Sequence, residues 1–222
     1  SLCPATAMFT EGARWARREY SPDVTLSRNE CLDRFRQALS AFGEPPGRQW
    51  EEFAELFRRR DLAKGDHFVR AGSRPTTLAF VVAGLLRIYY TRSDGKEFNK
   101  SFVFFPDFVA AFEALLAHEE STLSIQALEP TTLLVADHPS VVGFYEKGMY
   151  WQRLGRVLVE KLYAKKVRKE AAFLLDSAAE RYATFLADYR GVDNRVPDYH
   201  VASYLGITPE ALSRIRKPRL GR

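Results

Sequence analysis

The sequence predicts an α+β fold, with a small β-domain followed by a long helix and a cluster of short helices. Three observations predict it. Between residues 66 and 136, short runs rich in Val, Ile, Phe and Tyr alternate with turn residues, as in a small antiparallel sandwich or barrel. From residue 139 to about 175 a helical period holds without interruption. From residue 177 onward, three short helical segments carry clear start and stop signals.

The chain before the β-domain divides into an arm and two helices. Residues 1–29 have no steady periodicity, so we expect an irregular arm. Apolar residues at helical spacing predict a helix over residues 30–42, which Pro45-Pro46 ends. A second short helix is expected over residues 50–59, with its aromatic residues on one face.

The β-domain is expected to consist of short antiparallel strands. Asp94-Gly95 separates two of the runs and predicts a hairpin with a type I′ turn, in which both central residues have positive φ. The expected strands span residues 67–70, 79–82, 85–91, 97–104, 123–127 and 132–135.

The long helix carries an apolar seam. Its members recur every three or four residues, as in a helix that pairs with a copy of itself, so the seam predicts a homodimer. The alternative is that the stripe packs on the chain's own β-domain. The seam consists of Trp151, Leu154, Leu158 and Leu162.

Composition and charge bound the function. The chain has 46% hydrophobic residues, and none of its apolar stretches is long enough for a membrane span. Its first residues lack a basic region followed by an apolar core, so we expect a cytoplasmic protein without membrane association. The net charge of +5 is concentrated towards the C-terminus, which suits a polyanionic partner but does not identify one.

Metal, cofactor and enzyme chemistry are not indicated. Cys3 and Cys31 lie far apart and near no histidine cluster, so neither a zinc nor an iron–sulfur site is expected. The sequence has no glycine-rich phosphate loop, no Gly-x-Ser-x-Gly elbow and no His-Glu-x-x-His motif, which argues against an enzyme. The four histidines are expected to face solvent or cap helices: His67, His118, His138 and His200.

The most specific pattern is a helix-turn-helix near the C-terminus. Pro197 suits the first turn of a helix, and Gly206 suits a left-handed helix end. Thr208 is then the N-cap of a second helix, with Pro209 at its first position. The inward residues are expected to be Val201, Ala202, Leu205, Ala211, Leu212 and Ile215.

The outer face of this second helix has the residue types that read DNA. Arg214 can bind guanine with two hydrogen bonds, and Glu210 can accept from cytosine N4. The alternative is a helical hairpin that merely packs. The residues expected at the base edges are Thr208, Pro209, Glu210, Ser213, Arg214 and Lys217, and those expected at phosphates are Tyr199, Ser203, Arg216 and Lys217.

Segments 177–186 and 195–216 resemble the C-terminal domain of the Crp/Fnr family of bacterial regulators. Segments 64–66, 80–90, 94–97 and 124–129 resemble the family's cyclic-nucleotide-binding-type β-roll, so the likeness runs from about residue 30 to the end. It implies a double-stranded, jelly-roll-like β-roll, a central dimerisation helix and a helix-turn-helix. It also implies a transcription regulator that binds a near-palindromic operator in double-stranded DNA as a homodimer.

The resemblance implies a division of labour along the chain. A small-molecule effector would act on the β-roll, and RNA polymerase is a further partner that the family allows. The implied parts are an arm at residues 1–29, a sensor domain with leading helices at 30–138, a dimerisation helix at 139–175 and a DNA-binding domain at 176–222.

The cyclic AMP cassette of the family is altered here. Family members hold the ribose with a Gly-Glu pair, which falls on Ala110-Ala111, and the phosphate with an Arg-Ser/Thr pair, which falls on Ser121-Thr122. Because the phosphate arginine is missing and acidic residues surround the site, we expect that cyclic AMP does not bind in the usual way. The alternative function is a cyclic-nucleotide-sensing module that acts on a protein partner.

Overall fold

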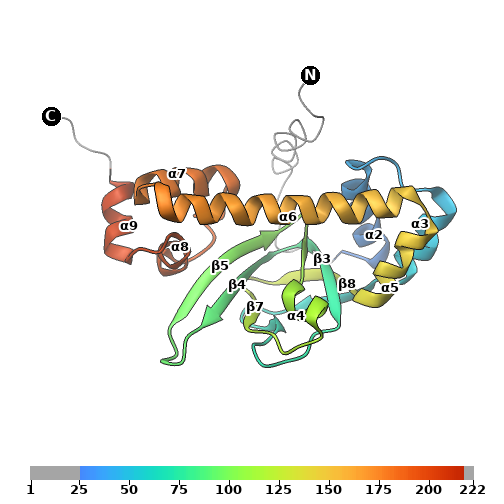
Figure 1. The fold of residues 1–222 in the computed structure, drawn as a ribbon, viewed down its shortest axis with the longest axis horizontal. Coiled ribbons are helices and arrows are strands. Elements are labelled where there is room, and N and C mark those ends of the chain that lie inside the picture. Colours follow the sequence, from blue (N-terminus) through green and yellow to red (C-terminus); the bar gives the residue numbers. More distant parts are fainter. Residues whose placement is uncertain (1–25, 218–222) are drawn as a thin grey trace, which may run out of the picture.

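A computed structural model describes residues 26–217 (Figure 1). Most of the expected N-terminal arm, together with Cys3, lies outside these residues. A β-roll packs beneath the middle of the long helix α6, Met149–Leu175. The N-terminal helices gather at one end of α6, and the three C-terminal helices gather at its other end (Figure 1).

The β-roll consists of two four-stranded sheets in the described residues, with strand orders β1-β8-β3-β6 and β2-β7-β4-β5. Every strand pair in them is antiparallel, which confirms the expected small antiparallel β-domain. The strands are β1 Arg58–Leu62, β2 His67–Val69, β3 Thr77–Ala83, β4 Leu85–Thr91, β5 Glu97–Phe104, β6 Asp107–Val109, β7 Leu123–Ala127 and β8 Thr131–Asp137.

The interior of the roll is filled with apolar side chains from both sheets. They stack because strand side chains alternate between the two faces of a sheet, so one face of each strand is buried. The short helix α4, Phe112–Ala117, adds Ala114 and closes one end of this core. The cluster includes Phe68, Val81, Leu86, Val103, Val109, Ala111, Leu123, Ile125 and Leu133.

Two local expectations for the β-domain are corrected. The hairpin between β4 and β5 is present, with Thr91 opposite Glu97, but only Gly95 of its turn has positive φ. A type I′ turn is therefore wrong, and Gly95 takes the left-handed position of a wider loop. The second helix was expected to run to residue 59, but Arg58 and Arg59 belong to β1. Its pairing with β8 makes it a strand.

The helices before the roll cover its first sheet. Helix α2, Arg28–Ser40, begins at Ser27, whose hydroxyl accepts from the Glu30 N–H in a capping box. Helix α3, Gly47–Glu55, follows and turns Trp50 and Phe53 into a second apolar cluster, which also contains Phe35 of α2 and Phe80 of β3. Both helices begin and end within a few residues of the expected positions.

The long helical segment is not continuous. It starts with α5, His138–Gly143, and the 3-10 helix η1, Phe144–Lys147, and only then enters α6. The break is at Gly148, whose φ of +149° is a conformation that glycine reaches without a steric penalty. The expected helix over residues 139–175 is therefore correct only from residue 149.

After α6 the chain turns at Asp176 and forms α7 Ala178–Asp188, α8 Asp198–Leu205 and α9 Pro209–Arg216. Ser177 starts α7 with a second capping box, to Glu180. A third apolar cluster joins these helices to the β4–β5 hairpin through Leu85 and Phe102. Among residues 26–217, no helix combines the length and the apolar character that crossing a membrane requires.

Candidate nucleic-acid interface

The turn between α8 and α9 has the local geometry that the sequence predicts. Gly206 ends α8 with φ +70° and ψ 32°, the left-handed conformation expected for it. A Cβ at this position would also lie 2.8 Å from the Phe173 ring of α6, so any other residue would require that ring to move. The Thr208 hydroxyl accepts from the Ala211 N–H at 3.2 Å and starts α9, with Pro209 in its first turn.

The inward residues of the two helices form a buried core, as expected. Val201, Ala202, Leu205 and Leu212 are each at most 1% exposed. Ala211 and Ile215 are half-buried beside them. Because both helices are fixed through these contacts and through their caps, the opposite face of α9 is held in a defined position.

That opposite face is exposed. All six residues expected at base edges are exposed to solvent: Thr208, Pro209, Glu210, Ser213, Arg214 and Lys217. A hydrogen bond from the Thr208 hydroxyl lowers the pKa of Glu210, so its carboxylate is ionised at neutral pH and is able to accept from a base. Neither sheet of the β-roll covers this face, since the roll meets α8 instead.

The residues expected at phosphates divide into two kinds. Tyr199 is 58% exposed. Arg216 donates to the Tyr182 hydroxyl at 3.0 Å and to an Asp198 carboxylate oxygen at 2.5 Å, so it clamps α9 to α7 and α8. Ser203 accepts from the Asn99 N–H at 2.9 Å and donates to the Glu97 carbonyl at 3.4 Å. In this arrangement, therefore, Arg216 and Ser203 serve contacts within the chain.

Sequence reasoning missed the polar contact between α8 and the β-roll. His200 was expected to face solvent or cap a helix, but it is 5% exposed and lies against the hairpin. The Asn99 Nδ2 group donates to the His200 carbonyl at 2.9 Å and lies 3.1 Å from its Nδ1 atom. Arg87 Nη1 lies 3.4 Å from the same Nδ1 atom and 2.6 Å from a Glu97 carboxylate oxygen. We call Arg87, Glu97, Asn99, His200 and Ser203 the docking cluster.

The charge of the docking cluster keeps His200 neutral. Burial and the Arg87 guanidinium lower the pKa of His200 to about 4, while Glu97 opposes the shift. A neutral imidazole has one acceptor nitrogen, and Nδ1 faces two donors here. Protonation of Nδ1 would therefore remove the acceptor that both donors share.

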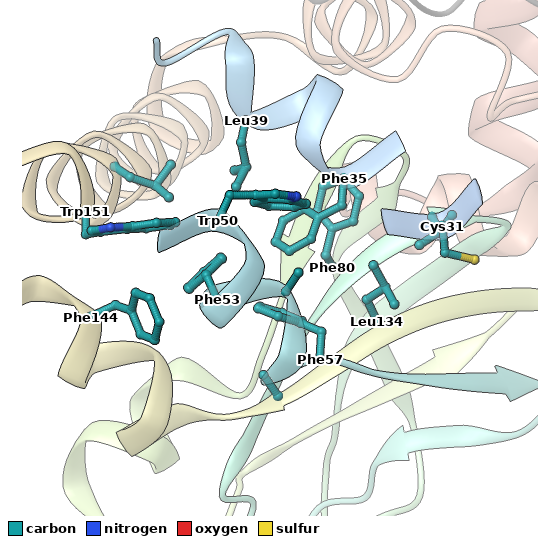
Figure 2. Packing of buried hydrophobic residues seen from close by; sticks show 14 of the residues in the cluster. Cys31, Phe35, Leu39, Trp50, Phe53, Phe57, Phe80, Leu134, Phe144 and Trp151 are labelled. Carbon is teal, nitrogen blue, oxygen red and sulfur yellow. The ribbon is translucent and has the colours of Figure 1, made fainter. Parts of the chain in front are cut away.

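Most of the expected dimer seam packs within the chain. Trp151 is 1% exposed, and its ring centroid lies 4.3 Å from that of Phe53 in the core beneath α3 (Figure 2). Leu154 is buried in the same cluster and Leu158 packs against it, so three of the four seam residues face the chain's own core. The alternative interpretation, packing within the chain, is correct for these three. Only Leu162, at 49%, is exposed.

Four apolar side chains in the middle of α6 are exposed. At about 100° per residue, Leu162 continues the line of Trp151, Leu154 and Leu158, and the other three lie to one side of that line. We call these four the exposed strip: Val159, Leu162, Tyr163 and Val167, which are 46%, 49%, 68% and 44% exposed.

The comparisons with known proteins agree with this architecture. Residues 59–147 match the family model of the cyclic nucleotide-binding domain. The chain is similar to CLP of Xanthomonas campestris, described as a c-di-GMP responsive global regulator, with 16% identity and a TM-score of 0.61 over 77% of this chain and 89% of that one. It is also similar to a transcriptional regulator of the Crp/Fnr family from Eubacterium rectale, with 17% identity and a TM-score of 0.60 over 77% and 82% of the two chains.

The chain has a Crp/Fnr-type fold. A third similar structure, FixK2 of Bradyrhizobium japonicum, has 20% identity and a TM-score of 0.58 over 72% of this chain and 82% of that one. None of the curated proteins matches the chain. The β-roll, the long helix and the helix-turn-helix thus follow one another in the order that the sequence predicts.

The four residues at the cassette positions lie in or beside the filled core of the roll. Ala111 is 1% exposed and Ser121 is 3% exposed. The Ser121 hydroxyl donates to the Leu123 carbonyl at 2.8 Å, so it is used by the chain itself. Ala110 is half-buried and Thr122 is exposed. The four positions therefore supply one occupied hydroxyl, one exposed hydroxyl and two methyl groups.

Proposed function

We propose that this chain is a transcription regulator that binds double-stranded DNA as a homodimer and reads the major groove with α9. The observation that carries the proposal is the outer face of α9, which is exposed, polar and basic while its inner face is fixed. Arg214 and Lys217 lie on this face with an ionised Glu210, and the face follows directly on the turn at Gly206 and the cap at Thr208. Recognition helices contact base edges with their N-terminal residues and phosphates with flanking cations.

The exposed strip supports the homodimer part of the proposal. An apolar stripe along a long exposed helix is stabilised when it packs against another apolar surface. A second copy of α6 supplies a strip of the same spacing, as in two-stranded helix pairs. The pairing residues would be Val159, Leu162, Tyr163 and Val167, without the three seam residues that pack within the chain, Trp151, Leu154 and Leu158.

The state of the cassette positions supports a regulator that does not use the family's contacts to cyclic AMP. The ribose and phosphate positions carry no charged side chain, and a buried phosphodiester without a cation is costly. Regulation by an effector, if it acts on the roll, would therefore use other residues.

DNA binding is tested by the salt dependence of affinity for a duplex of random sequence. Each phosphate contact contributes about 0.9 to the slope of log affinity against log salt concentration. We expect Lys217→Ala to reduce the slope by about one unit. Lys64→Ala removes an equal charge from the exposed turn between β1 and β2, outside α9, and should leave the slope unchanged. Fluorescence anisotropy of a labelled duplex measures both, and equal slopes in the three proteins would contradict binding through α9.

A further inference from the structure

A cavity of 90 Å³ lies where α6 meets α7 and α8. Four cationic residues line it, Lys165, Arg168, Lys169 and Arg181, against the single carboxylate of Asp188. Like charges gathered in a partly enclosed space repel one another more strongly than they do in water. Burial opposes the charge of Lys165, but Tyr189, Asp107 and Asp188 outweigh it and raise the pKa of this lysine, so its charge is compensated. The imbalance lies at Lys169, whose charged neighbours are cations, and an anion would relieve it.

Lys169 is an enclosed cation of this lining that has no carboxylate beside it among the described residues. Its ammonium donates to the Lys100 carbonyl at 2.5 Å and lies 3.8 Å from the centroid of the Tyr204 ring. Both partners offer only partial negative charge. Burial, together with the charges of Lys165 and Lys100, lowers the pKa of Lys169 to about 7.

Arg181 connects the cavity to the ends of three helices. It donates to the Asp176 carbonyl after α6 at 2.7 Å and to the Leu205 carbonyl at the end of α8 at 3.2 Å. Its guanidinium carbon lies 5.1 Å from the centroid of the Phe173 ring. A guanidinium has five N–H donors in a planar fork that matches an oxoanion, and these two bonds leave donors for one.

We propose that this cavity binds a phosphate-bearing anion between α6 and the helix-turn-helix. The volume has room for one phosphate group but not for a whole nucleotide, so a nucleotide would place its phosphate here and its remainder towards solvent. The anion would bridge Lys169 of α6 and Arg181 of α7, across the turn at Asp176. If the chain reads DNA as proposed above, this bridge fixes the angle at which α9 is presented.

Isothermal titration of inorganic phosphate into the full chain, in buffers of constant ionic strength made up with chloride, tests the site. We expect saturable binding that Lys169→Met weakens at least tenfold. Lys169→Arg keeps the charge and should retain most of the binding, which separates loss of the site from loss of folding. The matched control is Lys166→Met, which removes an equal charge from an exposed position of α6 outside the cavity.

A parallel titration with guanosine monophosphate distinguishes the two sources of a phosphate group. Tighter binding than inorganic phosphate assigns the site to nucleotides, and equal or weaker binding assigns it to the free ion. The proposal would be overturned if the heat of injection did not saturate, or if Lys169→Met and Lys166→Met bound phosphate equally. Because no DNA is present, these outcomes are independent of whether α9 reads a duplex.

Discussion

His200 is the residue through which pH acts on the contact between the β-roll and the helix-turn-helix. Its Nδ1 atom faces two donors, Asn99 Nδ2 and Arg87 Nη1, and the guanidinium stays charged at every accessible pH. Protonation would add a second positive charge and remove the acceptor. The docking cluster therefore depends on a neutral imidazole.

The predicted consequence is a loss of stability in mild acid. The pKa of His200 is about 4 in the folded chain against 6.5 for the unfolded residue. The unfolded state therefore takes up the proton first, and the contribution of neutral His200 is complete above pH 6.5 and lost as the pH falls towards 4. At about 1.4 kcal/mol per pH unit, the loss reaches about 2 kcal/mol at pH 5.

Urea unfolding at pH 7.5 and pH 5 measures this loss. His200→Gln removes the titrating group. Between pH 7.5 and pH 5, the free energy of unfolding of the wild type should therefore fall by about 2 kcal/mol more than that of the variant. His118→Asn is the matched control, since His118 is exposed and asparagine tolerates its left-handed backbone. Parallel losses in the wild type and His200→Gln would contradict the role of His200.

At the scale of elements, α6 has one apolar face that the chain itself covers and an apolar strip that is exposed. The face with Trp151 and Leu154 packs on α3 and on η1, and Phe144 and Phe53 surround it (Figure 2). The exposed strip has no such cover within residues 26–217. The covered face belongs to the folding of one chain, and the strip is available for association of two.

We predict that Leu162→Asp combined with Val167→Asp makes the chain monomeric, because the carboxylates would lose their hydration in an apolar interface. Sedimentation velocity at micromolar concentration measures the change. Leu116→Asp introduces the same charge at a residue of α4 that is 60% exposed and outside the strip, so this variant should remain dimeric. A double variant that sediments like the wild type would exclude the strip as the interface.

The elements that could be predicted from the sequence are those whose signals are local. Gly206, Thr208 and Pro209 lie within four residues of one another, so cap and turn geometry could be derived directly. The buried face of α6 could not be assigned, since both of its stripes have helical spacing and the partner of Trp151 is about a hundred residues earlier. The docking cluster was missed for the same reason, because Asn99 and His200 are brought together only by the tertiary fold.

At the scale of the whole molecule, α6 connects the helical cover of the β-roll to the helix-turn-helix (Figure 1). The roll contacts α8 through the docking cluster, while Gly206 in the turn packs against Phe173 of α6. Both contacts leave the outer face of α9 exposed. The position of α9 is thus set jointly by the roll and by the end of α6, so a change in either would alter how α9 meets DNA.

Selection of duplexes from a random pool by the purified chain tests the central claim most directly. A dimer that places one α9 helix in each of two successive major grooves should recover a two-fold-symmetric motif, with half-sites about one helical turn apart, roughly 34 Å. The motif should be the same with and without cyclic AMP, and Arg214→Ala should relax the preference at one base position in each half-site. Recovery of no motif under either condition would contradict the proposed reading of DNA by α9.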